Sequence, residues 1–220
     1  MDTSTAASAA CVLRTDGEAF ELAPDPRSLE RAPAHARELM PALADVMGRA
    51  GLVWDDLRAI AVGIGPGTFT GLRIGLATAR GLAAGAGLPL RPVPSLAALA
   101  EGIEGKLRLA AIDAKRGELF AALYEQSEDG LAARFGPVAA RPEVLAQRAT
   151  AAGPGVMAAG DGSVRFREVL EAAGIHVAPD GAGAHVVRAL HVCRLAQGVP
   201  DRPPEAVLPL YVREPDAKPQ

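Results

Sequence analysis

The 220-residue chain has little cysteine, few aromatic residues and almost no lysine. Its two cysteines, Cys11 and Cys193, are far apart, and no Cys-x-x-Cys or paired Cys/His spacing occurs. This usage excludes a disulfide framework, argues against structural zinc and is typical of a reducing compartment. Only Lys106, Lys115 and Lys218 are lysines among 23 basic residues, and 26 acidic residues give a net charge of −3. The sequence therefore lacks the polybasic field that binds nucleic acid unaided.

A long uninterrupted apolar run is also absent. The most apolar stretch, residues 59–90, is broken by glycine, proline and arginine, which excludes a transmembrane span. The first ten residues, MDTSTAASAA, have neither a basic nor an apolar region, so we expect no signal peptide and a cytoplasmic protein. With 49% hydrophobic and 22% charged residues, the chain can build a core.

Hydrophobic periodicity predicts an α/β protein. We expect strands at 9–13, 18–22, 58–64, 107–112, 117–124, 131–138, 156–159 and 175–178, and helices at 35–50, about 69–85, from 95, from 142, 163–173 and 185–197.

The two halves of the chain follow the same order of elements. Asp2 opens one half and Asp113 the other, and Gly65-Pro66-Gly67 and Gly160-Asp161-Gly162 occupy matching strand-to-helix turns. We interpret this as a diverged structural duplication. The predicted domains are an N-terminal lobe, residues 1–104, and a C-terminal lobe with a proline-rich tail, residues 105–220.

Three turns could bind an anion. Hydroxyls in Asp2-Thr3-Ser4-Thr5 can hold a phosphate and the Asp a hydrated Mg²⁺, although an Asx or ST turn that closes a hairpin explains the same residues. The glycine-rich turn with Gly65, Gly67 and Thr68 precedes a helix, which suits an anion or a partner's backbone, or else a tightly packed turn. It lacks the Lys-Ser/Thr pair of a Walker A loop. The charged turn at Asp113 is a third candidate, with a solvated turn as the alternative.

The helix after the glycine-rich turn has one face almost without side chains. Gly71, Gly75, Ala79 and Ala83 follow each other at intervals of four, so another helix can approach this face closely. Such a neighbour is either internal or another protein. No metal site is predicted, because His35 has Leu39 and no ligand at i+4.

Residues 61–83, AVGIGPGTFTGLRIGLATARGLA, resemble the signature of the bacterial TsaB family, also called YeaZ. Further similar segments are DTST (2–5), HARELMP (35–41), the Ser95-Leu96 pair with Ala100, IDAKRGELFAALY (112–124) and PLYVREPDA (209–217), so the resemblance covers essentially the whole chain. It implies a two-lobed fold of the actin-like type, shared with hexokinase and Hsp70 ATPases.

The resemblance implies a non-catalytic scaffold in the synthesis of threonylcarbamoyladenosine beside the tRNA anticodon. TsaD would transfer the carbamoyl-threonine group, with TsaB and the ATPase TsaE as partners, and tRNA would be contacted only through the complex. The implied dimer surface is the pair of N-lobe helices, and a homodimer could form without TsaD. The predicted interface residues are His35, Leu39, Leu43, Met47, Gly71, Arg73, Gly75, Ala79 and Ala83.

No cofactor is firmly implied, although ATP or ADP with Mg²⁺ is possible at a partner interface. Family members begin with several apolar residues before the DTS motif, whereas here Met1 directly precedes Asp2. Either the start codon is misassigned or the first strand is short. The alternative function is a stand-alone enzyme of the same fold, an ATP-dependent kinase or a peptidase.

Overall fold

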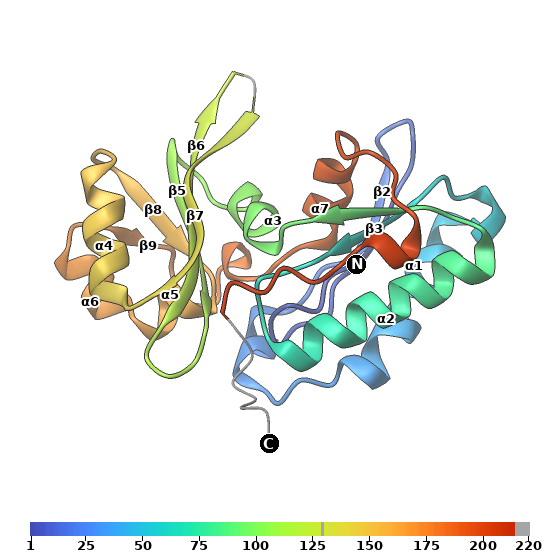
Figure 1. Ribbon diagram of the computed structural model, residues 1–220, viewed down its shortest axis with the longest axis horizontal. Helices are drawn as coiled ribbons and strands as arrows, with labels where there is room; N and C mark the ends of the chain where they lie inside the picture. Colours follow the sequence, from blue (N-terminus) through green and yellow to red (C-terminus); the bar gives the residue numbers. More distant parts are fainter. Residues whose placement is uncertain (129, 214–220) are drawn as a thin grey trace.

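The computed structural model describes residues 1–128 and 130–213 and has two α/β lobes side by side (Figure 1). In the first lobe, β1 (Ala10–Leu13) pairs antiparallel with β2 (Ala19–Leu22), and β3 (Ile60–Gly63) pairs parallel with β4 (Leu90–Val93). The long helices α1 (His35–Ala50) and α2 (Phe69–Ala86) pack on these strands.

Local sequence explains where the first-lobe elements begin and end. Gly17 takes a φ of 92° in the turn between β1 and β2, a conformation that favours glycine. Both long helices end at a glycine in the left-handed conformation, Gly51 after α1 and Gly87 after α2. The apolar residues of α1 recur at helical spacing, and its Leu39 and Val46 are buried in the core of the lobe.

The second lobe contains one continuous five-stranded sheet in the order β7-β6-β5-β8-β9. These strands are β5 (Leu107–Asp113), β6 (Leu119–Ser127), β7 (Gly130–Ala140), β8 (Val156–Ala159) and β9 (His176–Val177). The lobe's helices are α4 (Pro142–Ala151), α5 (Asp161–Arg165) and α6 (Arg167–Ala172). β5 is antiparallel to β6 and parallel to β8, and β8 is parallel to β9.

Two further helices connect the lobes. α3 (Ser95–Glu101) and α7 (Ala189–Ala196) share one core cluster with β5, β6 and β8. α7 also packs against all four strands of the first lobe. Short 3₁₀ helices lie at Pro26–Glu30, Trp54–Asp56, Gly183–His185 and Pro204–Ala206.

The predicted division at residue 104 is wrong for the end of the chain. Leu90 and Arg202 exchange backbone hydrogen bonds of 2.9 Å, and the Leu210 N–H donates to the Ile64 carbonyl at 2.8 Å. Val207 is buried in the first-lobe core. The first lobe therefore consists of residues from both ends of the chain, because the apolar residues of the tail complete its core.

Most predicted elements are confirmed, with three corrections. The predicted helix 163–173 is two helices that meet at Phe166, and the helix predicted from 185 begins at 189 after a 3₁₀ turn. β4 was not predicted because it contains Pro92, which lacks a ladder donor. Among the named strands, β4 pairs only with β3. It can therefore contain a proline, which lacks the N–H that a second neighbouring strand would need.

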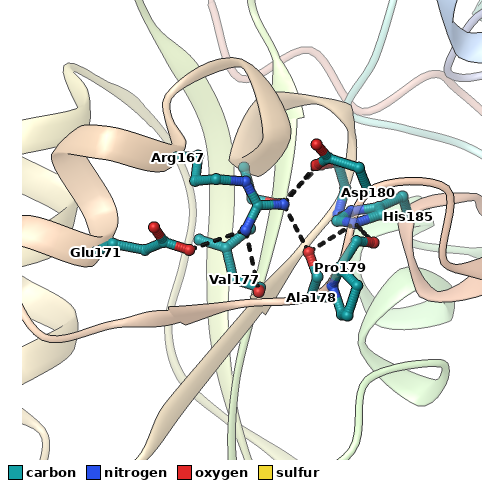
Figure 2. Close-up of polar contacts among 9 residues, drawn as sticks. Arg167, Glu171, Val177, Ala178, Pro179, Asp180 and His185 are labelled. Atoms are coloured by element: carbon teal, nitrogen blue, oxygen red, sulfur yellow. Dashed lines mark hydrogen bonds and ion pairs between the residues drawn. The ribbon is translucent and has the colours of Figure 1, made fainter.

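A hydrogen-bond network centred on Arg167 fixes the loop after β9 (Figure 2). Its guanidinium donates to the Val177 and Ala178 carbonyls at 3.2 and 2.7 Å and pairs with Glu171 and Asp180. The adjacent His185 ring accepts the Gly160 N–H at Nδ1 (3.1 Å), which leaves the proton on Nε2, facing the Ala178 and Pro179 carbonyls. This network holds the second lobe's last strand against α6.

Candidate functional site

The N-terminal turn, residues 2–9, lies at the base of α2. The Asp2 carboxylate accepts the Ser4 N–H at 2.8 Å and the Ser4 hydroxyl at 2.6 Å on one oxygen. Its other oxygen accepts the Ser95 hydroxyl at 2.6 Å. Asp2 and Ala9 exchange backbone hydrogen bonds of 3.1 and 2.9 Å, which close the hairpin. This is an Asx turn whose carboxylate is saturated by the chain's own donors.

The glycines of the signature allow this turn to approach α2 closely. A Cβ on Gly67 would clash with the Ser4 carbonyl, and a Cβ on Gly71 with the Thr3 carbonyl. The Thr68 N–H donates to the Ser4 carbonyl at 2.8 Å, and the Thr3 hydroxyl donates to the Gly71 carbonyl at 2.8 Å. The glycine-rich turn and helix start thus dock against the chain's own backbone.

The phosphate-site prediction for the first lobe is therefore corrected in favour of its alternative. Asp2, Thr3, Ser4 and Thr5 are at most 2% exposed, and the donors and acceptors of Asp2 and Ser4 are occupied by the chain itself. Gly65 is buried, and Gly67 is in contact with Ser4. Asp2 and the hydroxyls of Thr3 and Ser4 do not fit a magnesium nucleotide, because they are already bound to Ser95, to the Gly71 carbonyl and to each other. The Thr68 hydroxyl, by contrast, is buried without a hydrogen-bond partner among the described residues.

The second lobe repeats the same turn at Asp113. One carboxylate oxygen accepts the Lys115 N–H at 2.8 Å, as Asp2 accepts Ser4, while the other contacts the Lys115 ammonium at 2.8 Å and the Arg165 guanidinium at 2.7 Å. Burial alone would raise the pKa of Asp113, but these hydrogen bonds and charges lower it below its usual value. The predicted anion-binding residue is itself an anion paired with two cations.

His35, at the start of α1, is 3% exposed and is hydrogen-bonded through Nδ1 to the Ser8 hydroxyl at 2.9 Å. Burial lowers the pKa of its ring. Within residues 1–128 and 130–213, no group of three or more His, Cys, Asp or Glu side chains is placed to hold a metal ion. No helix in the same described part of the chain is long and apolar enough to cross a membrane.

Most of the predicted interface residues face the interior of the first lobe. The small side of α2 faces inward, with Gly71 and Gly75 against Thr3. Leu39, Leu43, Met47, Ala79 and Ala83 are buried in the first-lobe core. His35 is buried as well. Of the predicted set, only Arg73 is exposed. The internal alternative for the small face is thus correct.

A second small-residue face on α2 is exposed instead. Ala77, Gly81 and Gly85 follow Arg73 at intervals of four and are exposed, and a Cβ on either glycine would meet nothing within 4 Å. At the start of the helix, Arg73 lies 3.8 Å over the Phe69 ring, and Phe69, 44% exposed, stacks on Tyr211. We call Arg73, Ala77, Gly81 and Gly85 the outer face of α2.

The neighbouring helix α1 also has an exposed face. Met40 is 46% exposed, and Ala44 and Gly48 follow it at intervals of four. α1 packs against α2, so the two exposed faces belong to one helical layer (Figure 1). The sequence contained this signal, but both faces of α2 share the same four-residue spacing, and periodicity alone does not tell which one turns inward.

Comparisons with known proteins agree with this architecture. A family model described as TsaD, tRNA N6-adenosine threonylcarbamoyltransferase, matches residues 28–201. The tRNA threonylcarbamoyladenosine biosynthesis protein TsaB of Escherichia coli is 43% identical over 101 residues, which cover 44% of this chain and 44% of that protein. The matched stretch thus spans less than half of that relative.

Longer matches extend the similarity to most of the chain. An uncharacterized protein of Mycobacterium bovis is 34% identical over 195 residues, covering 86% of this chain and 79% of its own length. A crystal structure from Pseudomonas aeruginosa, described as similar to peptidase YeaZ, superimposes with a TM-score of 0.79 at 28% identity, covering 96% of this chain and 97% of that one.

The fold is that of a two-lobed α/β protein of the actin-like type, as predicted. The chain belongs to the TsaD-type family. Its similarity to proteins named TsaB and to structures described as YeaZ agrees with the resemblance found in the sequence.

Proposed function

We propose that this chain acts in tRNA threonylcarbamoyladenosine biosynthesis as a non-catalytic scaffold subunit. The observation that carries the proposal is the family match over residues 28–201, supported by the similarity to TsaB proteins. The scaffold role is supported by the N-terminal turn, where Asp2 binds Ser4 and Ser95 and is closed to a substrate.

The proposed main partner is a TsaD-type protein, bound by the exposed layer of α1 and α2. The outer face of α2 has small residues that let a partner helix approach closely, and Met40 of α1 adds an exposed apolar contact. TsaE is the second proposed partner. Contact with tRNA is proposed only within the complex, since a net charge of −3 offers no general attraction to phosphate. A nucleotide with Mg²⁺ at a partner interface stays a prediction.

Co-purification with TsaD from the same organism tests the interface. Ala77→Trp places a large side chain on the outer face of α2, and we expect it to weaken TsaD binding by about a hundredfold or more through steric exclusion. Ala151→Trp is the matched control, because Ala151 is an exposed helical alanine at the end of α4 in the other lobe. Equal TsaD binding by both variants would reject the proposed surface.

Nucleoside analysis of tRNA tests the function itself. Depleting this chain in its own cells should lower threonylcarbamoyladenosine, and the Ala151→Trp variant should restore it while Ala77→Trp does not. Unchanged modification after depletion would reject the proposed role. Turnover of ATP or a peptide by the isolated chain would instead support the enzyme alternative. Without TsaD, sedimentation should show a concentration-dependent homodimer that Ala77→Trp breaks.

A further inference from the structure

The two cysteines of the chain, Cys11 on β1 and Cys193 on α7, lie against each other although they are 182 positions apart. The Cys193 thiol donates to the Cys11 carbonyl, with 3.7 Å between sulfur and oxygen, and the two thiols are also hydrogen-bonded to each other. Both are free thiols. The fold thus brings all the thiol chemistry of the chain to one place, and the proposed function uses none of it.

Small side chains allow this contact. Ala9 and Cys11 lie on the same side of the first strand, because side chains alternate along an extended chain. Ala189 and Cys193 lie on one face of α7, because they are four residues apart. The four residues pack in one cluster with Leu190. Since both alanines are at most 1% exposed, the helix approaches the strand closely and each thiol meets the other.

The start of α7 is anchored to the neighbouring strand. Glu21 of β2 stands opposite Cys11 in the β1–β2 pair, and its side chain is 7% exposed. Its carboxylate accepts the Leu190 N–H at 3.0 Å and the Arg188 Nε–H at 3.0 Å. Cys193 follows about one helical turn later. The position of Cys193 over β1 is therefore fixed by backbone contacts of the helix and does not depend on the rotamer of one side chain.

The two thiols differ in exposure and in acidity. Cys11 is buried, whereas Cys193 is partly exposed. Hydrogen bonding to Cys11 lowers the pKa of the Cys193 thiol, although burial and the Glu21 carboxylate oppose this shift. The same hydrogen bond, together with burial, raises the pKa of Cys11. Cys193 is thus the thiol that forms a reactive thiolate, and Cys11 is a second thiol within reach behind it.

We propose that Cys11 and Cys193 are an oxidation site, at which a hydroperoxide converts the two thiols into a reversible disulfide between β1 and α7. The Cys193 thiolate attacks one peroxide oxygen, the O–O bond breaks, and Cys193 becomes a sulfenic acid while the leaving oxygen takes up a proton. The Cys11 sulfur then attacks the Cys193 sulfur. The S–S bond forms, the S–O bond breaks, and hydroxide leaves with the Cys11 proton as water.

The two steps balance as a two-electron oxidation. With hydrogen peroxide, two thiols and one peroxide give one disulfide and two molecules of water. A reducing compartment keeps the pair as thiols until a peroxide is present, and transient, redox-sensing disulfides are the kind that such compartments contain. The proposal does not depend on the proposed function.

The disulfide fastens the helix that connects the two lobes. α7 packs against β1 and the other strands of the first lobe and shares a core cluster with strands of the second. The bond would close a loop of 182 residues, which restricts the unfolded chain strongly. Oxidation should therefore raise the unfolding temperature of the protein, and reduction should reverse the rise.

Peptide mapping of the full chain tests the disulfide. The reduced protein is treated with hydrogen peroxide, its remaining thiols are alkylated, and it is cleaved with trypsin after arginine. We expect the Cys11 peptide that ends at Arg14 to be joined to residues 189–194, with two hydrogens lost and with separation by dithiothreitol. Oxidation of the cysteines to separate sulfinic or sulfonic acids, or a disulfide only between two copies of the chain, would overturn the proposal.

Two matched variants separate the roles of the thiols. In Cys11→Ala, peroxide should leave a sulfenic acid on Cys193 that dimedone labels. In Cys193→Ala, the remaining thiol should react with peroxide about tenfold more slowly, because it is buried. Peroxide should raise the unfolding temperature of the wild-type chain by a few degrees and that of neither variant. Equal reaction rates in the two variants, or the same rise in all three proteins, would contradict the assignment, and the peptide map of the wild-type chain stands even if a variant folds poorly.

Discussion

The two lobes contain the same aspartate turn, but the aspartate side chain binds different groups in each lobe. In each, an aspartate accepts the backbone N–H two residues later at 2.8 Å, and a glycine turn packs against that segment. Asp2 is surrounded by the hydroxyls of Ser4 and Ser95, whereas Asp113 faces the cations of Lys115 and Arg165. The geometry of the turn is thus shared, while its electrostatics differ.

The helices of the lobes differ as well. α1 and α2 have 16 and 18 residues, whereas α4, α5 and α6 have 10, 5 and 6. The first lobe therefore has a long helical layer with a continuous exposed face, and the second has short helices under an unbroken sheet. In a duplicated fold, one half can therefore provide an exposed helical surface for a partner while the other half forms a continuous sheet.

Replacing an inward glycine of α2 should have the largest effect on this comparison. Gly71→Val puts a side chain into the Thr3 carbonyl, and we expect a loss of about 3 kcal/mol in the free energy of unfolding. Gly81→Val, on the outer face of the same helix, should change it by less than about 1 kcal/mol, because the site is open. Urea unfolding measures both, and equal losses would refute the assignment of inner and outer faces.

The two aspartates should differ in a measurable way. Asp2→Ala leaves the Ser4 N–H and two hydroxyls without their acceptor inside the lobe, at a cost of about 2–3 kcal/mol. Asp113→Ala removes pairs with the exposed side chains of Lys115 and Arg165 and should cost about 1 kcal/mol. Chemical denaturation of the two variants tests this order, and a larger loss for Asp113→Ala would contradict it.

The smallest expected effect is a pH dependence of the protein's stability, which comes from His35 on α1 and His191 on α7. Burial lowers the pKa of His35 and of His191 below the ordinary 6.5. The unfolded chain therefore binds protons at these rings at a higher pH than the folded chain, so stability is highest above about pH 6.5 and decreases as the pH falls. Thermal unfolding at pH 7.5 and 5.5 should show a lower midpoint at 5.5.

A double variant and a control test whether the two buried histidine rings cause this pH dependence of stability. His35→Gln combined with His191→Gln should flatten the dependence between pH 7.5 and 5.5, whatever the variant's overall stability. His176→Gln is the matched control, because His176 is exposed on β9, and it should keep the wild-type slope. An unchanged slope in the double variant would assign the effect to other groups.

The sequence predicted the elements well because strong local signals mark them. The helix 35–50 and the strand 156–159 are found with the predicted bounds, since apolar spacing and a following glycine define both. The candidate site was predicted less well. The glycines at 67, 71 and 75 indicate a close approach, but the approaching group is Thr3 or Ser4, about seventy positions away in the same chain. Only tertiary structure distinguishes this internal contact from an external one.

The return of the tail to the first lobe also sets an order of events during synthesis. Residues 107–177 contain the whole five-stranded sheet and leave the ribosome as one block, so the second lobe has its strands before translation ends. The first lobe begins at Met1 but needs Val207 and Leu210 to close its core and cap the Ile64 edge. The part of the protein that is made first is therefore completed last.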